Sequence, residues 1–112
     1  MARHAGRCGV ARRLAAVVML LVTAAPAADA APADESGKLK AARCETCHGA
    51  RGISVTPLVP NLAGQKEAYL VVALQEYRDG RRSNAMTRAI AATLSDADMS
   101  EIAAYFSRLP PR

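Results

Sequence analysis

Residues 43–49 have the sequence Arg-Cys-Glu-Thr-Cys-His-Gly, which contains the pattern C-x-x-C-H. In this pattern two thiols bond covalently to a porphyrin and the adjoining imidazole ligates its iron, as in a c-type haem. Cys44 and Cys47 are three residues apart and His48 lies four residues beyond Cys44, so one helical turn presents all three side chains on one side. The pattern therefore predicts one haem c per chain, tethered by both cysteines and ligated through His48.

The first thirty residues have the composition of a secretory signal peptide. A basic opening precedes an apolar run over residues 14–22, and small residues then lead to Ala28-Asp29-Ala30. The run is too short for a membrane-spanning helix, which needs about 20 residues. We predict a signal peptide over residues 1–30, export to the periplasm, and a domain over residues 31–112 with no transmembrane span. The alternatives are an uncleaved membrane anchor and export by a twin-arginine route.

Removal of the signal peptide would also change the charge. The sequence has 15 basic and 10 acidic residues, and four of the arginines and one aspartate lie within the first thirty residues. The remaining part keeps 11 basic and nine acidic side chains, a net charge of +2 that two haem propionates would bring close to neutral. No basic stripe with interleaved aromatic residues is present, so binding to nucleic acid is not expected.

The periodicity of residues 31–112 is helical, and no segment alternates in the way that predicts a half-buried strand. We expect a first helix over about residues 37–47, capped by Asp34 or Ser36, which carries the haem motif at its carboxyl end. Residues 49–64 form a loop that needs a surface to pack on. A haem edge would suit its apolar residues, which are Ile53, Val55, Leu58, Val59 and Leu62.

Three further helices are predicted beyond this loop. The second covers about residues 65–79 and ends at Gly80 in a left-handed conformation. A short helix follows over residues 87–94, and Ser95 and Asp98 begin the last one with a capping box. The last helix runs to about residue 108 and should bury Met99, Ile102, Ala103 and Phe106. The pattern therefore predicts an all-α domain.

The opposite face of the iron is either open or filled by a second ligand. Ligation by two histidines of one chain is excluded, because His48 is the only histidine after the predicted signal peptide, and methionine is the next candidate. Met99 has the spacing of a core residue, whereas Met86 is expected in a polar loop from which its thioether could reach the iron, with Asn84 orienting the sulfur. We predict Met86 as the ligand and an apolar cleft facing both axial ligands. An iron with both axial positions filled suits an electron carrier and has no place for substrate, so no catalytic residue is expected.

Several segments together resemble a small class I c-type cytochrome. They are the haem motif, Pro60-Asn61-Leu62-Ala63-Gly64-Gln65, Tyr69-Leu70, Arg78-Asp79-Gly80, Met86, and the stretch from Leu94-Ser95-Asp96 to Ala104-Tyr105-Phe106. The resemblance spans nearly all of residues 36–109, and it is closest to single-haem bacterial carriers and to one half of dihaem bacterial cytochromes. The chain lacks a second haem motif, so a dihaem carrier is excluded for this chain by itself.

The resemblance implies a class I cytochrome c fold, with three main helices plus short helices and loops wrapped around one covalently bound haem. It implies that the Pro60 carbonyl accepts a hydrogen bond from His48, that Leu62 belongs to the haem pocket, and that the first and last helices cross near Gly37. The function it implies is periplasmic transfer of single electrons between redox partner proteins, as in a respiratory chain.

Other functions compete with this interpretation. A thioredoxin-like dithiol would need a βαβ scaffold, and a zinc site would need a fourth ligand. The stronger alternative is the haem c subunit of a multi-chain periplasmic dehydrogenase or reductase, and a third is a gas-binding sensor with a labile sixth ligand. Four arginines bracket the Met86 segment and are candidates for pairing with a haem propionate or an acidic redox partner: Arg78, Arg81, Arg82 and Arg88.

Overall fold

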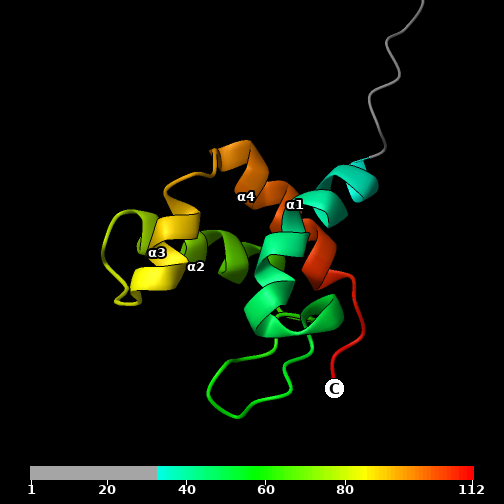
Figure 1. The fold of residues 1–112 in the computed structure, drawn as a ribbon. Coiled ribbons are helices and arrows are strands. Elements are labelled where there is room, and N and C mark those ends of the chain that lie inside the picture. Colours follow the sequence, from blue (N-terminus) through cyan, green and yellow to red (C-terminus); the bar gives the residue numbers. More distant parts are fainter. Residues whose placement is uncertain (1–32) are drawn as a thin grey trace, which may run out of the picture.

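The computed structural model describes residues 33–112, so the predicted signal peptide and its cleavage site lie outside the described residues. Four α-helices and one short 3-10 helix follow one another along the chain (Figure 1). They are α1 (Ala33–His48), η1 (Ala50–Gly52), α2 (Glu67–Arg78), α3 (Ala85–Ala91) and α4 (Asp96–Ser107). No strand occurs between residues 33 and 112, which confirms the all-α prediction for this range. None of these helices has both the length and the hydropathy of a membrane span.

The first and last helices pack against each other around Gly37, as the resemblance implies (Figure 1). A Cβ atom at Gly37 would lie 2.5 Å from the backbone carbonyl oxygen of Glu101, so only glycine allows this approach. Lys40 of α1 adds two ion pairs across the same contact, to Asp98 at 2.8 Å and to Glu101 at 2.7 Å. Helix α1, which bears the haem motif at its carboxyl end, is therefore held against α4.

Helix α4 supplies the largest buried side chains of the core. The four residues that its spacing predicts as buried are all 2% exposed or less, and Tyr105, which was not predicted, is 9% exposed. Leu70 and Ala73 of α2 are also buried, and the core continues through Leu94 and Ala91. These values confirm which face of α4 is buried, and Met99 is a core residue as expected.

Helix α1 begins earlier than the sequence predicts. Asp34 and Ser36 lie inside its first turns and do not cap it. Asp34 forms an ion pair with Arg108, and the Ser36 hydroxyl donates a hydrogen bond to Oε2 of Glu101 at 2.5 Å. Both side chains therefore bind residues that are distant in the sequence. A prediction from local capping preferences cannot include such partners.

The predicted helix ends elsewhere agree more closely. Helix α2 begins two residues later than predicted, and Gly80 after it has φ of 78°, the left-handed conformation that was expected. Ser95 and Asp98 form the predicted capping box of α4. Helix α3 begins at Ala85, before its predicted start, because the Asn84 side chain accepts hydrogen bonds from the Thr87 amide and hydroxyl at 3.0 and 3.1 Å.

The loop between η1 and α2 is held to the core by its backbone. The Gly52 carbonyl accepts hydrogen bonds from the amides of Leu62 and Ala63, and the Gly64 amide donates to the carbonyl of Phe106 at 2.9 Å. The middle of the loop projects outward, and Val55 is 97% exposed. The loop thus has a fixed base and an exposed tip.

Candidate haem site

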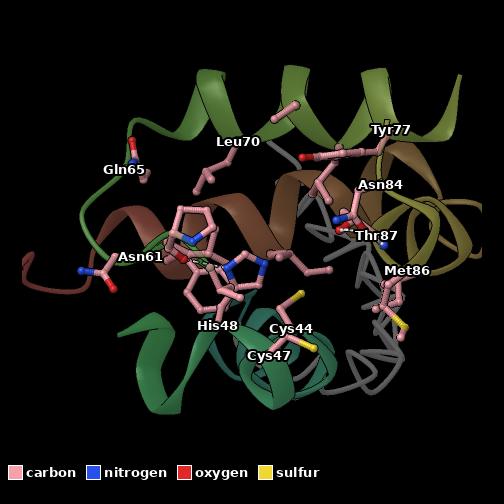
Figure 2. Close-up of a pocket in the computed structure, with 18 of the residues that line it drawn as sticks. Cys44, Cys47, His48, Asn61, Gln65, Leu70, Tyr77, Asn84, Met86 and Thr87 are labelled. Carbon is pink, nitrogen blue, oxygen red and sulfur yellow. Dashed lines mark hydrogen bonds between the residues drawn. The ribbon is translucent and has the colours of Figure 1, made fainter. Parts of the chain in front are cut away.

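The structure brings the predicted site residues around one cavity of about 390 Å³ (Figure 2). The C-x-x-C-H turn of α1 forms one side, apolar side chains of α2 form the opposite wall, and Ile102 and Phe106 of α4 close the interior. The segment from Leu58 to Leu62 and the first turn of α3 border it as well. Every cofactor-binding and metal-ligating residue predicted from the sequence lines this cavity: Cys44, Cys47, His48, Pro60, Leu62 and Met86.

The imidazole of His48 is oriented by the loop. Its Nδ1 lies 2.7 Å from the carbonyl oxygen of Pro60, the hydrogen bond that the resemblance implies. A proton on Nδ1 makes this atom the donor and leaves Nε2 unprotonated, with its lone pair free for a metal. Figure 2 shows the ring standing beside the two cysteines within the cavity. The arrangement therefore suits axial ligation of a haem iron through Nε2.

The two cysteines differ in exposure. Both are free thiols that line the cavity; Cys44 is 9% exposed, whereas Cys47 is exposed. Burial raises the pKa of the Cys44 thiol to about 11, although the nearby Arg43 opposes the shift. A protonated, buried thiol carries no charge into an apolar cavity, so its position is compatible with covalent attachment to an apolar macrocycle. Two free thiols and one oriented imidazole form the donor set that a c-type haem requires.

The loop residues divide into those that line the cavity and those that do not. Leu58, Val59 and Leu62 line it, and Leu62 also packs against the core. Ile53 and Val55 do not, so the expectation that these two residues pack on the haem edge was wrong. The Oδ1 of Asn61 accepts a hydrogen bond from the Ser54 amide at 2.7 Å, which joins the segment of Ile53 and Val55 to the segment that lines the cavity.

Met86 lies at the border of the cavity, and its position differs from the sequence expectation. It belongs to the first turn of α3, where it is 66% exposed, and not to the preceding loop. Figure 2 shows its side chain beyond Thr87, away from His48. Met99 is fully buried in the core and does not line the cavity. Asn84 lines the cavity and caps α3 through Oδ1, and its role in orienting the sulfur stays a prediction.

The four arginines around the α2–α3 connection have different surroundings. Arg78 pairs with Asp96 at 2.8 Å and Arg81 with Asp79 at 3.2 Å, and neither lines the cavity. Arg82 lines it and pairs with Glu76 at 3.0 Å. Local carboxylates therefore neutralise three of the four side chains, which weakens the prediction that they form a basic docking surface.

Sequence reasoning did not identify all the residues that line the cavity. Arg43 precedes the motif and donates to the Thr93 hydroxyl at 3.2 Å, and its adjacency to Cys44 was a signal that could have indicated it. Gln65, Thr87 and Ile90 also line the cavity. Their participation depends on how α2 and α3 are placed in space, and no local pattern in the sequence reports that placement.

Comparison with known proteins agrees with this geometry. A family profile described as cytochrome c matches residues 33–110. Cytochrome c4 of Pseudomonas aeruginosa is 44% identical over 72 residues, which are 64% of this chain and 36% of that protein. Cytochrome c-554(548) of Halomonas halodenitrificans is 42% identical over 75 residues, 64% of this chain and 90% of that protein.

The name of a third relative states the enzyme from which it accepts electrons. The thiosulfate dehydrogenase electron acceptor of Thiomonas intermedia is 42% identical over 104 residues, 89% of this chain and 45% of that protein. Among solved structures, cytochrome c4 of Acidithiobacillus ferrooxidans superposes with a TM-score of 0.62 at 32% identity, over 70% of this chain and 50% of that one. The chain thus spans about a third to a half of the length of the longer relatives and nearly all of the shorter one.

Proposed function

Because this chain belongs to the cytochrome c family, we propose that it is a periplasmic carrier of single electrons with histidine and methionine as axial ligands. Haem c, covalently bound, is the cofactor of this family. The observation that carries the proposal is the convergence of Cys44, Cys47 and the Pro60-oriented His48 on one apolar cavity that Met86 also borders. No residue of the chain is required to act as an acid, a base or a nucleophile.

When bound, haem supplies a one-electron Fe(III)/Fe(II) couple. The residues of the chain set the conditions for that couple. The thiols of Cys44 and Cys47 would tether the group, and the hydrogen bond to the Pro60 carbonyl would make His48 a more basic ligand. The apolar wall of Leu70, Ala73 and Leu74 excludes water, which favours the less charged Fe(II) state and raises the reduction potential.

Met86 is proposed as the sixth ligand. It is the methionine that borders the cavity, and its unbranched side chain has three rotatable bonds with which the sulfur could turn from its exposed position toward the iron. The Asn84 cap fixes the first turn of α3, so this movement would require rotation of the side chain and no unfolding of the helix. A thioether opposite histidine is suited to a carrier, because it raises the potential of the iron.

The proposal is tested by optical spectroscopy of the ferric protein. Met86→Ala should retain covalently bound haem and lose the weak charge-transfer band at the red end of the visible spectrum that a thioether ligand produces. Met99→Leu is the matched control: it replaces a buried methionine at similar volume, so the band should remain. A band that survives in Met86→Ala would exclude Met86 as the ligand. Rapid binding of carbon monoxide by the ferrous wild type would favour the gas-binding sensor.

A second candidate function is that of an electron-accepting subunit for a periplasmic dehydrogenase. Its support is the similarity, over most of this chain, to the electron acceptor of thiosulfate dehydrogenase. The test is to mix the ferric protein with thiosulfate and a purified thiosulfate dehydrogenase and to follow haem reduction by absorbance. Reduction that needs both the enzyme and thiosulfate would support this function, whereas slow reduction compared with other periplasmic donors would favour a general carrier.

We also propose that residues 1–30 direct export and are then removed. The support is the order of basic, apolar and small residues that ends in Ala28-Asp29-Ala30. Amino-terminal sequencing of the protein from a periplasmic extract should begin at Ala31. A protein that is recovered with its first residues intact from the membrane fraction would indicate an uncleaved anchor.

A further inference from the structure

Arg82 lies in the connection between α2 and α3, and its side chain contacts α2 at three residues. Its Nε lies 3.0 Å from Oε2 of Glu76, and its Nη2 donates a hydrogen bond of 3.3 Å to the Tyr69 hydroxyl. The guanidinium carbon stands 5.5 Å from the ring centroid of Tyr69 and 5.6 Å from that of Tyr77, within the range of cation–π attraction. The Arg82 side chain therefore attaches the α2–α3 connection to a carboxylate, a hydroxyl and two aromatic rings, all of them on α2.

The backbone of this connection is attached at the same place. The amides of Arg81 and Arg82 both donate to the carbonyl oxygen of Glu76, at 2.8 and 3.1 Å. Arg82 is two residues before Asn84, which caps α3, and four residues before Met86. The position of Arg82 on α2 therefore limits where the first turn of α3 can lie.

The same residues border the cavity. The cavity lining includes Arg82, Tyr69, Tyr77 and Met86, and Figure 2 shows the Tyr77 side chain on the cavity side of α2, above Asn84. Glu76 is outside the lining and touches the site through Arg82. Arg81, its neighbour, also lies outside the lining; its side chain is 62% exposed and pairs with Asp79 in its own segment. The two arginines thus have equal charge and adjacent positions but different contacts.

We propose that Arg82 is a positioning residue that clamps the first turn of α3 to α2 and so holds the Met86 thioether on the haem iron. This inference rests on the proposed ligation by Met86. Because a thioether is a weak ligand, its retention depends on how firmly the protein holds the segment that carries it. The Arg82 guanidinium provides this restraint through an ion pair, a hydrogen bond and contacts with two rings, all on α2.

The clamp is tested on the ferric holoprotein by imidazole binding at saturating concentration, where the limiting rate equals the rate at which the sulfur leaves the iron. Arg82→Gln should raise this rate by about tenfold, because it removes a charge-assisted hydrogen bond and the ring contacts. Glu76→Gln should raise it by about threefold, since the ion pair is partly exposed. Arg81→Gln is the matched control and should change it by less than about twofold. Equal rates in Arg82→Gln and Arg81→Gln would overturn the proposal, as would an unchanged rate in Glu76→Gln.

Two further measurements separate this proposal from the ligand assignment. If the ferric wild type lacks the thioether band, the assignment of Met86 fails, and imidazole binding says nothing about sulfur. Hydrogen exchange of the backbone amides at positions 81 and 82 then reports the clamp by itself. Faster exchange in Arg82→Gln than in the wild type would support an anchored connection, and equal exchange would overturn it even where the band is present.

Discussion

Gly37 allows two helices to meet backbone to backbone, which makes its missing side chain a structural requirement. An added Cβ would lie 2.5 Å from the Glu101 carbonyl oxygen and 3.3 Å from Cβ of Tyr105. The nearest atom is backbone, so relief requires α1 and α4 to separate. Alanine favours a helix by about 1 kcal/mol over glycine, but overpacking of a core costs about 1–3 kcal/mol and also disturbs the ion pairs nearby. The clash should dominate.

We therefore predict that Gly37→Ala lowers the free energy of unfolding by about 1–2 kcal/mol, measured by guanidinium titration of the ferric protein. Lys38→Ala is the control on the same helix, because Lys38 has an exposed side chain whose removal should change the stability by less than about 0.5 kcal/mol. A Gly37→Ala protein as stable as the control would mean that the helices can shift without cost.

Individual residues also show what sequence reasoning could and could not predict about the site. The C-x-x-C-H spacing placed Cys44, Cys47 and His48 on one turn because the period of a helix fixes their directions. The Pro60 contact followed from the resemblance, and the structure has it at 2.7 Å. Met86 was assigned to a loop, since its neighbours are polar, yet the Asn84 side chain extends α3 back to include it. Such a cap depends on a hydrogen bond between residues, which composition alone does not reveal.

At the scale of the helices, the contact between α1 and α4 depends on a charge cluster of Lys40, Asp98 and Glu101. The hydrogen bond from Lys40 lowers the pKa of the Asp98 carboxyl to about 2, with Ser95 contributing, and Lys40 and Ser36 lower the pKa of Glu101. The same carboxylates, Asp98 first, raise the pKa of Lys40. None of these groups was predicted to interact across helices, because their pairing requires the crossing at Gly37.

These shifts predict how stability depends on pH. A carboxyl whose pKa is lower in the folded state stabilises the protein above its usual pKa, and this contribution is lost as the pH falls toward its folded value. The guanidinium concentration at the midpoint of unfolding should therefore decrease as the pH is lowered. The decrease begins near the usual pKa values, 4.5 for Glu101 and 3.8 for Asp98, and continues to a pH of about 2. Lys40→Met should flatten this dependence, whereas Lys38→Met should retain it. Equal pH profiles of the two variants would show that the cluster does not govern acid stability.

At the scale of the whole molecule, the buried core is small and borders the cavity, which is lined by Leu70, Ile102 and Phe106 of the core. The fully buried large side chains come from α4, while α2 presents Leu70, Ala73 and Leu74 to the cavity as well as to the core. A domain of this size buries limited apolar surface on its own, and natural small domains often depend on a cofactor or a covalent staple. Leu70 and Ala73 are already buried, and a bound haem would add apolar surface against the side chains that line the cavity.

We accordingly predict that the Cys44→Ala, Cys47→Ala double variant, which cannot attach haem, loses cooperative folding. Its far-ultraviolet circular dichroism should show clearly less helix than the holoprotein, and its thermal transition should be broad. Thr46→Ala is the control, because Thr46 lies exposed in the same turn and offers no thiol, so haem attachment and cooperative unfolding should persist. Near-native helix content with a sharp transition in the double variant would mean that α4 and its partners fold independently, and that haem binds a site already formed. Loss of cooperativity would instead make the C-x-x-C-H turn a condition for the fold as well as the point of attachment, because the apolar side chains that line the cavity would then depend on haem to keep them from water.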